Sequence, residues 1–167
     1  MKKNEYFVPL LANDSMANLP PLTFFQGLVV QDDGERSDRF DLRRGALRPL
    51  ADVGRVFTLE RADSFQTATV ARFEAAGVET GAAIDSEMDT DSGLENAQQR
   101  GLFADAASTF RVALYHQARI GLRDGAGGWE IEPKALSKLE QQVLKNGFRT
   151  IMKLLQFTAE RNGIRPR

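Results

Sequence analysis

The chain has 167 residues, of which 42% are hydrophobic and 27% carry a charge. These values suit one soluble globular domain with a real core and exclude extensive disorder. The formal net charge of −1 gives no electrostatic footprint for nucleic acid or for an anionic membrane.

Two residue types set limits on the chemistry. The absence of cysteine excludes disulfides, cysteine nucleophiles and thiolate metal sites, and a single histidine excludes a multi-histidine zinc site within one chain. No apolar run reaches the roughly 18 residues of a membrane helix, and the N-terminus lacks a signal-peptide core before Pro9. We therefore expect a cytoplasmic protein whose partners include neither nucleic acid nor membrane.

The first part of the chain predicts a helical lead-in over residues 1–18 and then a β-hairpin over residues 22–43. Residues 22–30 are rich in β-branched, aromatic and aliphatic side chains, and Asp32-Asp33-Gly34 supplies turn residues. The following segment alternates between apolar and polar residues, with Phe40 and Leu42 on its apolar face.

Residues 46–162 show helical periodicity and predict a bundle packed against this hairpin. The predicted helices cover residues 49–60, 65–76, 93–122 and 135–162, with Pro49 in the first turn of the first of them. Gly77 should end the second, and the small, acidic segment 78–92 predicts a loop. The fold class is thus mainly α: one domain over residues 1–167, with four to five helices and one β-hairpin.

The two longest predicted helices each carry an apolar stripe, and a glycine-rich turn at 125–128 makes them antiparallel neighbours. The stripes are Phe103, Ala107, Phe110, Leu114 and Ala118 in the first helix, and Leu144, Phe148, Ile151, Leu155 and Thr158 in the second. Leu102, Ala106, Ala113 and Ile120 widen the first stripe, and Leu139, Val143 and Leu154 lie beside the second.

Charged residues gather between positions 41 and 55, where we expect the hairpin and the first helix to bring them into a small volume. Guanidinium groups bind phosphate in a bidentate manner, so the arginines are candidates for an anion-binding patch. The aspartates could instead neutralise them in an ion-pair network, and the sequence leaves both readings open. The residues are Asp41, Arg43, Arg44, Arg48, Asp52 and Arg55.

A second candidate group lies in the long helix, where His116 and Gln117 precede Arg119. The imidazole titrates near neutral pH and could act as an acid or base, or the pair could bind a base edge. Alternatively, both side chains could satisfy buried backbone groups where the bundle meets the hairpin.

Residues 89–93, Asp-Thr-Asp-Ser-Gly, superficially match the carboxylates and turn that hold two Mg²⁺ ions and a triphosphate in nucleotidyl transfer. No predicted strand precedes them, so we interpret them as part of an acidic loop. We expect no metal and no other cofactor in this chain.

Four motifs, in this order, resemble the putative nucleotidyltransferase substrate-binding domain over roughly Leu19–Ala159. Such a domain follows a nucleotidyltransferase-like catalytic domain in bacterial signalling proteins, often with CBS or cyclic-nucleotide-binding modules, similar to PII uridylyltransferase-type proteins. The motifs are PPLTFF (20–25), DLRRGALRPLADVGRV (41–56), YHQAR (115–119) and LSKLEQQVLKNGFR (136–149).

The resemblance implies an accessory substrate-binding or regulatory role, with an acceptor protein or small molecule presented to a separate catalytic domain, in cis or in trans. That partner domain would hold the nucleoside triphosphate and Mg²⁺, and this chain alone would not be catalytic. The resemblance also favours substrate-facing roles for Arg43 and Arg55. The alternative is a protein-protein interaction or homodimerisation module without a small-molecule ligand, which uses the exposed faces of the last two helices.

Overall fold

The structure is a computed structural model that describes residues 6–17, 39–61, 65–82, 90–125 and 127–164. Helices dominate these residues, which confirms the predicted mainly-α class of four to five helices. The elements are α1 (Phe7–Ser15), β1 (Phe40–Asp41), α2 (Arg48–Glu60), α3 (Thr69–Ala82), α4 (Thr90–Asp124), β2 (Glu130–Ile131) and α5 (Lys138–Arg161).

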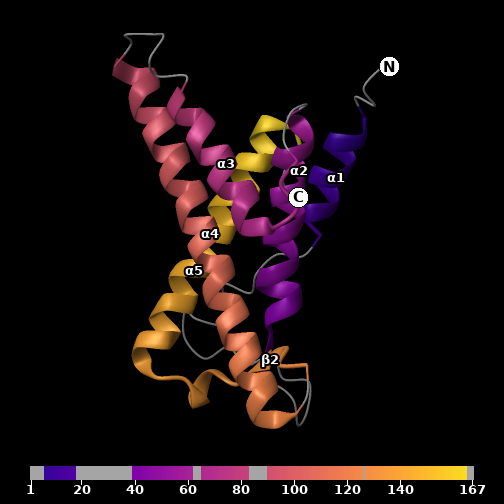
Figure 1. The fold of residues 1–167 in the computed structure, drawn as a ribbon, viewed down its shortest axis with the longest axis vertical. Coiled ribbons are helices and arrows are strands. Elements are labelled where there is room, and N and C mark those ends of the chain that lie inside the picture. The colour runs from indigo at the N-terminus through magenta and orange to yellow at the C-terminus, as the bar shows by residue number, and fades with distance from the viewer. Residues whose placement is uncertain (1–5, 18–38, 62–64, 83–89, 126, 165–167) are drawn as a thin grey trace.

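The long helix α4 runs the length of the molecule (Figure 1). Helix α3 packs along its first half, and α5 returns antiparallel to it after the turn that contains β2. Helix α2 contacts both α3 and α5, and α1 packs mainly against α2. The helices therefore enclose one apolar core.

Strand β1 pairs antiparallel with β2, with Phe40 opposite Ile131 and Asp41 opposite Glu130. Both Phe40 and Ile131 are buried. The first strand and the turn of the predicted hairpin, residues 22–38, lie outside the described residues. The described partner of β1 is thus a segment some ninety positions later, which sequence alternation could not reveal because it carries no information on pairing partners.

Helix α2 begins earlier than we predicted, because a π-helical turn over Arg43–Leu47 leads directly into it. In this turn the N–H of Arg48 donates to the carbonyl of Arg43, five residues back. Pro49 cannot donate an N–H, and its ring would crowd the carbonyl four residues before it. A wider π turn at this point lets the helix start before the proline.

The prediction for α3 was wrong at both ends. Phe65 is 88% exposed and precedes the helix, which starts at Thr69. Gly77 does not end it, because this glycine packs against Phe103 of α4 and the helix continues to Ala82. The predicted loop at 78–92 is therefore helical at both ends, at 78–82 and 90–92, while residues 83–89 lie outside the described part.

The predicted stripe of α4 is correct only in its first half. Phe103 and Ala107 are buried, but Leu114 and Ala118 are exposed. Ala113 and Ile120, which we expected beside the stripe, are buried. The buried face turns around the helix axis because the first part of α4 packs on α3, whereas its later turns contact α5, β2 and the π turn.

The predicted stripe of α5 is confirmed, since all five of its residues are buried. Ser137 caps the helix in a reciprocal capping box with Glu140. Gly163, with φ of 65°, ends it, and the N–H of Ile164 donates to the carbonyl of Ala159 at 2.8 Å. Leu139 and Val143, expected beside the stripe, are exposed instead.

Candidate functional site

Three of the predicted site residues form an ion-pair cluster on α2. The Asp52 side chain is buried, with 6% of the residue exposed, and it pairs with Arg55 and with Arg48, whose Nε lies 3.7 Å from Oδ2. Arg55 in turn lowers the pKa of Arg72 on α3, in addition to the larger effect of burial. Asp52 is therefore a neutralising partner within the chain for both Arg48 and Arg55.

The other predicted arginines lie at the opposite end of the same continuous helix. Arg43 stacks over the Trp129 ring, 5.1 Å from its centroid, and Asp41 accepts a 3.0 Å hydrogen bond from the backbone N–H of Arg44. Arg43 and Arg55 are 12 residues apart, which is roughly 18 Å of helix axis. The expectation of one small cluster was wrong, because the helix begins before Arg43 rather than at Pro49.

Charge-reversing variants of Arg55 and Arg43 distinguish an ion-pair role from a role in anion binding. Arg55→Glu should lower the free energy of unfolding by about 1–2 kcal/mol, because it places a carboxylate beside the buried Asp52. Arg43→Glu should lower it by less than about 1 kcal/mol, since only the contact with Trp129 is lost. Urea denaturation of both variants measures the difference. Equal stability of the two variants would contradict an ion-pair role for Arg55.

The second predicted group, His116, Gln117 and Arg119, lies in the C-terminal part of α4. Gln117 Nε2 lies 3.5 Å from the carbonyl oxygen of Gly127, and Arg119 forms an ion pair with Glu140 on α5 and lies over the Tyr115 ring. Hydrogen bonds from Ser137 and Arg119 lower the pKa of Glu140 to about 2. These contacts tie α4 to the following turn and to α5, and a role in ligand binding stays a prediction.

His116 is 2% exposed, and its Nδ1 has no hydrogen-bond partner among the described residues. Burial, reinforced by the Arg119 guanidinium and opposed by Glu140, lowers the pKa of His116 below its ordinary value of 6.5. The imidazole is therefore held neutral inside the fold.

Stability should consequently fall as the pH drops below about 6.5, because the unfolded chain then binds a proton that folded His116 rejects. His116 is the only histidine, so the variant His116→Gln should remove most of this slope between pH 7 and about pH 5.5. Thermal unfolding of both proteins across this range measures it. An unchanged slope in the variant would show that another group causes it.

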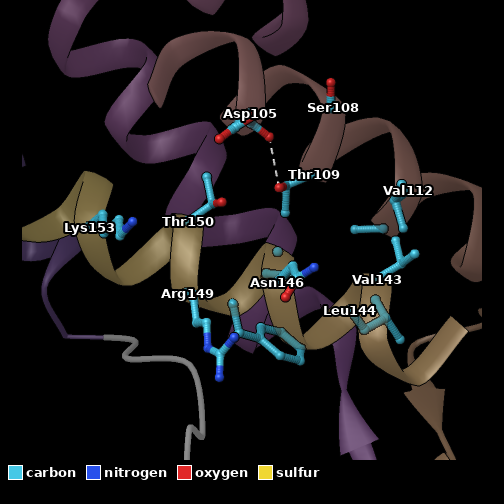
Figure 2. Close-up of a pocket in the computed structure, with 14 residues that line it drawn as sticks. Asp105, Ser108, Thr109, Val112, Val143, Leu144, Asn146, Arg149, Thr150 and Lys153 are labelled. Atoms are coloured by element: carbon cyan, nitrogen blue, oxygen red, sulfur yellow. Dashed lines mark hydrogen bonds between the residues drawn. The ribbon is translucent and has the colours of Figure 1, made fainter. Parts of the chain in front are cut away.

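A cleft of about 450 Å³ opens between α4 and α5, and none of the predicted site residues lines it. Figure 2 shows side chains from the two helices lining it, and Ala46 of the π turn also contributes. The α4 residues are Asp105, Ser108, Thr109, Val112 and Ala113, and the α5 residues are Val143, Leu144, Asn146, Gly147, Phe148, Arg149, Thr150 and Lys153.

This cleft was not predicted from the sequence. Its polar residues occupy outward-facing helix positions, which read as ordinary solvent-exposed residues. The only signal was a glycine in the middle of a strongly helical segment, Gly147, which is often a site of close helix packing. Here a Cβ on Gly147 would lie 2.8 Å from the Thr109 methyl group, so this pair marks a close approach of α4 and α5.

The close approach of Gly147 and Thr109 provides a test of how α4 and α5 are aligned along the cleft. Gly147→Ala alone should destabilise the protein by about 1 kcal/mol, because the methyl overlap outweighs the helix propensity gained. In a Thr109→Ser background the obstructing methyl is gone, and the same change should stabilise by roughly 0.5–1 kcal/mol. A double-mutant cycle from urea denaturation measures this. Equal effects in both backgrounds would contradict the close approach.

Within the described ranges, no three or more histidine or carboxylate side chains come together as a possible metal site. The same residues contain no helix whose length and apolarity would allow it to cross a membrane.

Comparison with known proteins gives one result that covers almost the whole chain. The family model described as "Putative nucleotidyltransferase substrate binding domain" matches residues 5–161. Comparisons with curated proteins and with solved structures gave no match. The chain belongs to the family of putative nucleotidyltransferase substrate-binding domains.

Proposed function

We propose that this chain is the accessory substrate-binding domain of a nucleotidyltransferase-type bacterial signalling protein, and that it presents an acceptor to a separate catalytic domain. The match of residues 5–161 to the family carries this proposal. The partner domain, in cis or in trans and with or without CBS modules, would hold the nucleoside triphosphate and Mg²⁺. This chain would act in the cytoplasm and supply the acceptor rather than the chemistry.

The cleft between α4 and α5 is the place where we expect the acceptor to bind. Its volume of about 450 Å³ falls within the range of roughly 300–1,000 Å³ that small-molecule pockets occupy. It combines an apolar floor with charged and hydroxyl side chains, as such pockets usually do. By contrast, the arginines at 48 and 55 already share Asp52.

A transfer assay tests the proposal. The nucleotidyltransferase-like domain from the same protein or operon is mixed with an α-³²P-labelled triphosphate, Mg²⁺ and a small-molecule and protein extract of the source organism. Label should enter an acceptor efficiently only when this chain is present. Val143→Trp should block the cleft and abolish the effect, whereas the similarly sized Val143→Thr should retain it. Equal labelling without the chain would overturn the proposal.

A specific observation also favours the alternative of homodimerisation. Leu122 and Leu139 are 89% and 74% exposed, and Tyr115 is exposed on the same side of α4 as Leu122. All three lie close in sequence to the Arg119–Glu140 ion pair that joins α4 to α5. Analytical ultracentrifugation of wild type and Leu122→Ser would reveal a dimer that this apolar surface holds together, and a wild-type monomer would refute it.

A further inference from the structure

The cleft between α4 and α5 has a charged end and an apolar end. Gly147 faces Thr109 in the antiparallel pair, so residues before Thr109 lie beside residues after Gly147. This register places Asp105 near Thr150 and Lys153 at one end, as Figure 2 shows. Val112 lies near Val143 and Leu144 at the other end.

The charges at the polar end are available to a ligand. In the part of the chain that the structure describes, Asp105, Arg149 and Lys153 take part in no ion pair. Elsewhere on α4 the cations do find carboxylates, as in Arg111 with Glu74. Opposite charges thus line the cleft from its two walls, Asp105 from α4 and Lys153 from α5, whereas the Arg149 guanidinium points away from Asp105 (Figure 2).

Hydrogen-bonding groups surround these charges. The Thr109 hydroxyl is used by its own helix, because it donates to the Asp105 carbonyl at 2.8 Å (Figure 2). Thr150 lies at the same end of the cleft, whereas the Ser108 hydroxyl points away from Asp105 and Thr150 (Figure 2). The Thr150 hydroxyl can orient a small polar group that carries both charges, since a hydroxyl both donates and accepts.

From this arrangement we propose that the cleft binds a free α-amino acid with an apolar side chain. Its ammonium group would bind Asp105, its carboxylate would bind Lys153, and its side chain would occupy the apolar end beside Val112 and Val143. A nucleoside triphosphate fits less well, because Asp105 would repel the phosphates that Lys153 attracts. A fatty acid would leave Asp105 without a partner. The inference rests on the proposed function, because it takes this cleft as the acceptor site.

Isothermal titration calorimetry of the full chain with L-phenylalanine, L-leucine and L-valine tests the inference. At least one should bind saturably at a single site. Asp105→Asn should weaken that binding roughly tenfold or more, as should Lys153→Gln, because each removes a charge-assisted hydrogen bond. Matched controls are Glu95→Gln on α4 and Lys138→Gln on α5, both exposed and outside the cleft, which should bind as wild type does.

Two analogues of phenylalanine assign each charge to its partner. 3-Phenylpropanoate lacks the ammonium group and should bind to Asp105→Asn at least as tightly as to wild type, because no attraction is lost and a repulsion is removed. 2-Phenylethylamine lacks the carboxylate and should likewise bind to Lys153→Gln at least as tightly as to wild type. Binding of none of the three amino acids, or binding that neither cleft variant alters, would overturn the inference. If transfer of label in the assay above still requires this chain, the proposed function stands while the amino-acid inference fails.

Discussion

Replacing Phe103 with alanine is expected to lower the free energy of unfolding by about 3–5 kcal/mol. Phe103 is only 3% exposed and lies on α4 at the centre of an aromatic cluster. Its ring lies 4.9 Å from Phe57 of α2, 6.4 Å from Phe73 of α3 and 6.1 Å from Phe157 of α5. One side chain therefore contacts rings from three other helices, and urea denaturation followed by far-UV circular dichroism measures its loss.

The size of this effect has two sources. Removing a buried phenyl ring leaves a cavity that rigid neighbouring helices cannot fill. The contact with Phe57 is edge-to-face at 78°, and such a pair adds roughly 0.5–1.5 kcal/mol beyond the buried area. Gly77 of α3 also packs against the Cβ of Phe103, so the position helps hold α3 to α4.

The matched control for this prediction is Phe65→Ala. Phe65 is exposed and precedes α3, so its removal should change stability by no more than about 0.5 kcal/mol. Phe103→Leu should cost less than Phe103→Ala, because leucine fills part of the cavity. A loss below about 1 kcal/mol for Phe103→Ala would mean that the aromatic cluster does not hold the four helices together.

Helix α5 shows what a single sequence can predict. Its buried face keeps one direction from Leu144 to Thr158, because one continuous surface covers it, and a simple helical repeat then suffices. Its ends follow local chemistry, a capping box at Ser137 and a left-handed glycine at 163. Where local propensity and packing agree, the prediction was right in type and at the C-terminal end, whereas the helix begins at Lys138 rather than at residue 135.

The errors arise where a distant element decides the local structure. The repeat through Leu114 and Ala118 is a valid helical stripe, but α4 changes packing partners along its length, and the later partners bury Ala113 and Ile120, which we expected only at the edge of that stripe. Likewise, Gly77 is a plausible helix end until Phe103 of α4 packs against it. Neither partner lies within the sequence window from which the helix was predicted.

The candidate site was harder to predict than the fold for the same reason. The ion-pair network that the sequence left open forms between Arg48 and Asp52, which are four residues apart on one helix. The sequence could not show that a π turn carries the helix back to Arg43 and separates the arginines. The cleft depends on the register between two helices, which a Gly147–Thr109 contact sets and which no periodicity records.

Replacing Gly128 with alanine is expected to lower the free energy of unfolding by about 3–5 kcal/mol, from backbone strain and overlap together. Gly128 has a φ of 68°, which side chains other than glycine disfavour, and it is buried against the last turns of α4. An added Cβ would overlap the carbonyl oxygen of Gln117 and lie 2.7 Å from the nitrogen of Gly121. Thermal and urea unfolding measure the loss.

Gly125 provides the matched control, because it belongs to the same turn and has a similar φ of 64° but no atom within 4 Å of an added Cβ. Gly125→Ala should therefore lower the free energy of unfolding by only about 1–2 kcal/mol, from backbone strain alone. The difference between the two variants isolates the packing of the turn against α4. That packing also positions β2 to pair with β1. Trp129 follows Gly128, and the Trp129 carbonyl accepts a 2.7 Å hydrogen bond from the N–H of Leu42. Equal losses for both variants would show that backbone conformation alone, and not contact with α4, makes glycine necessary at position 128.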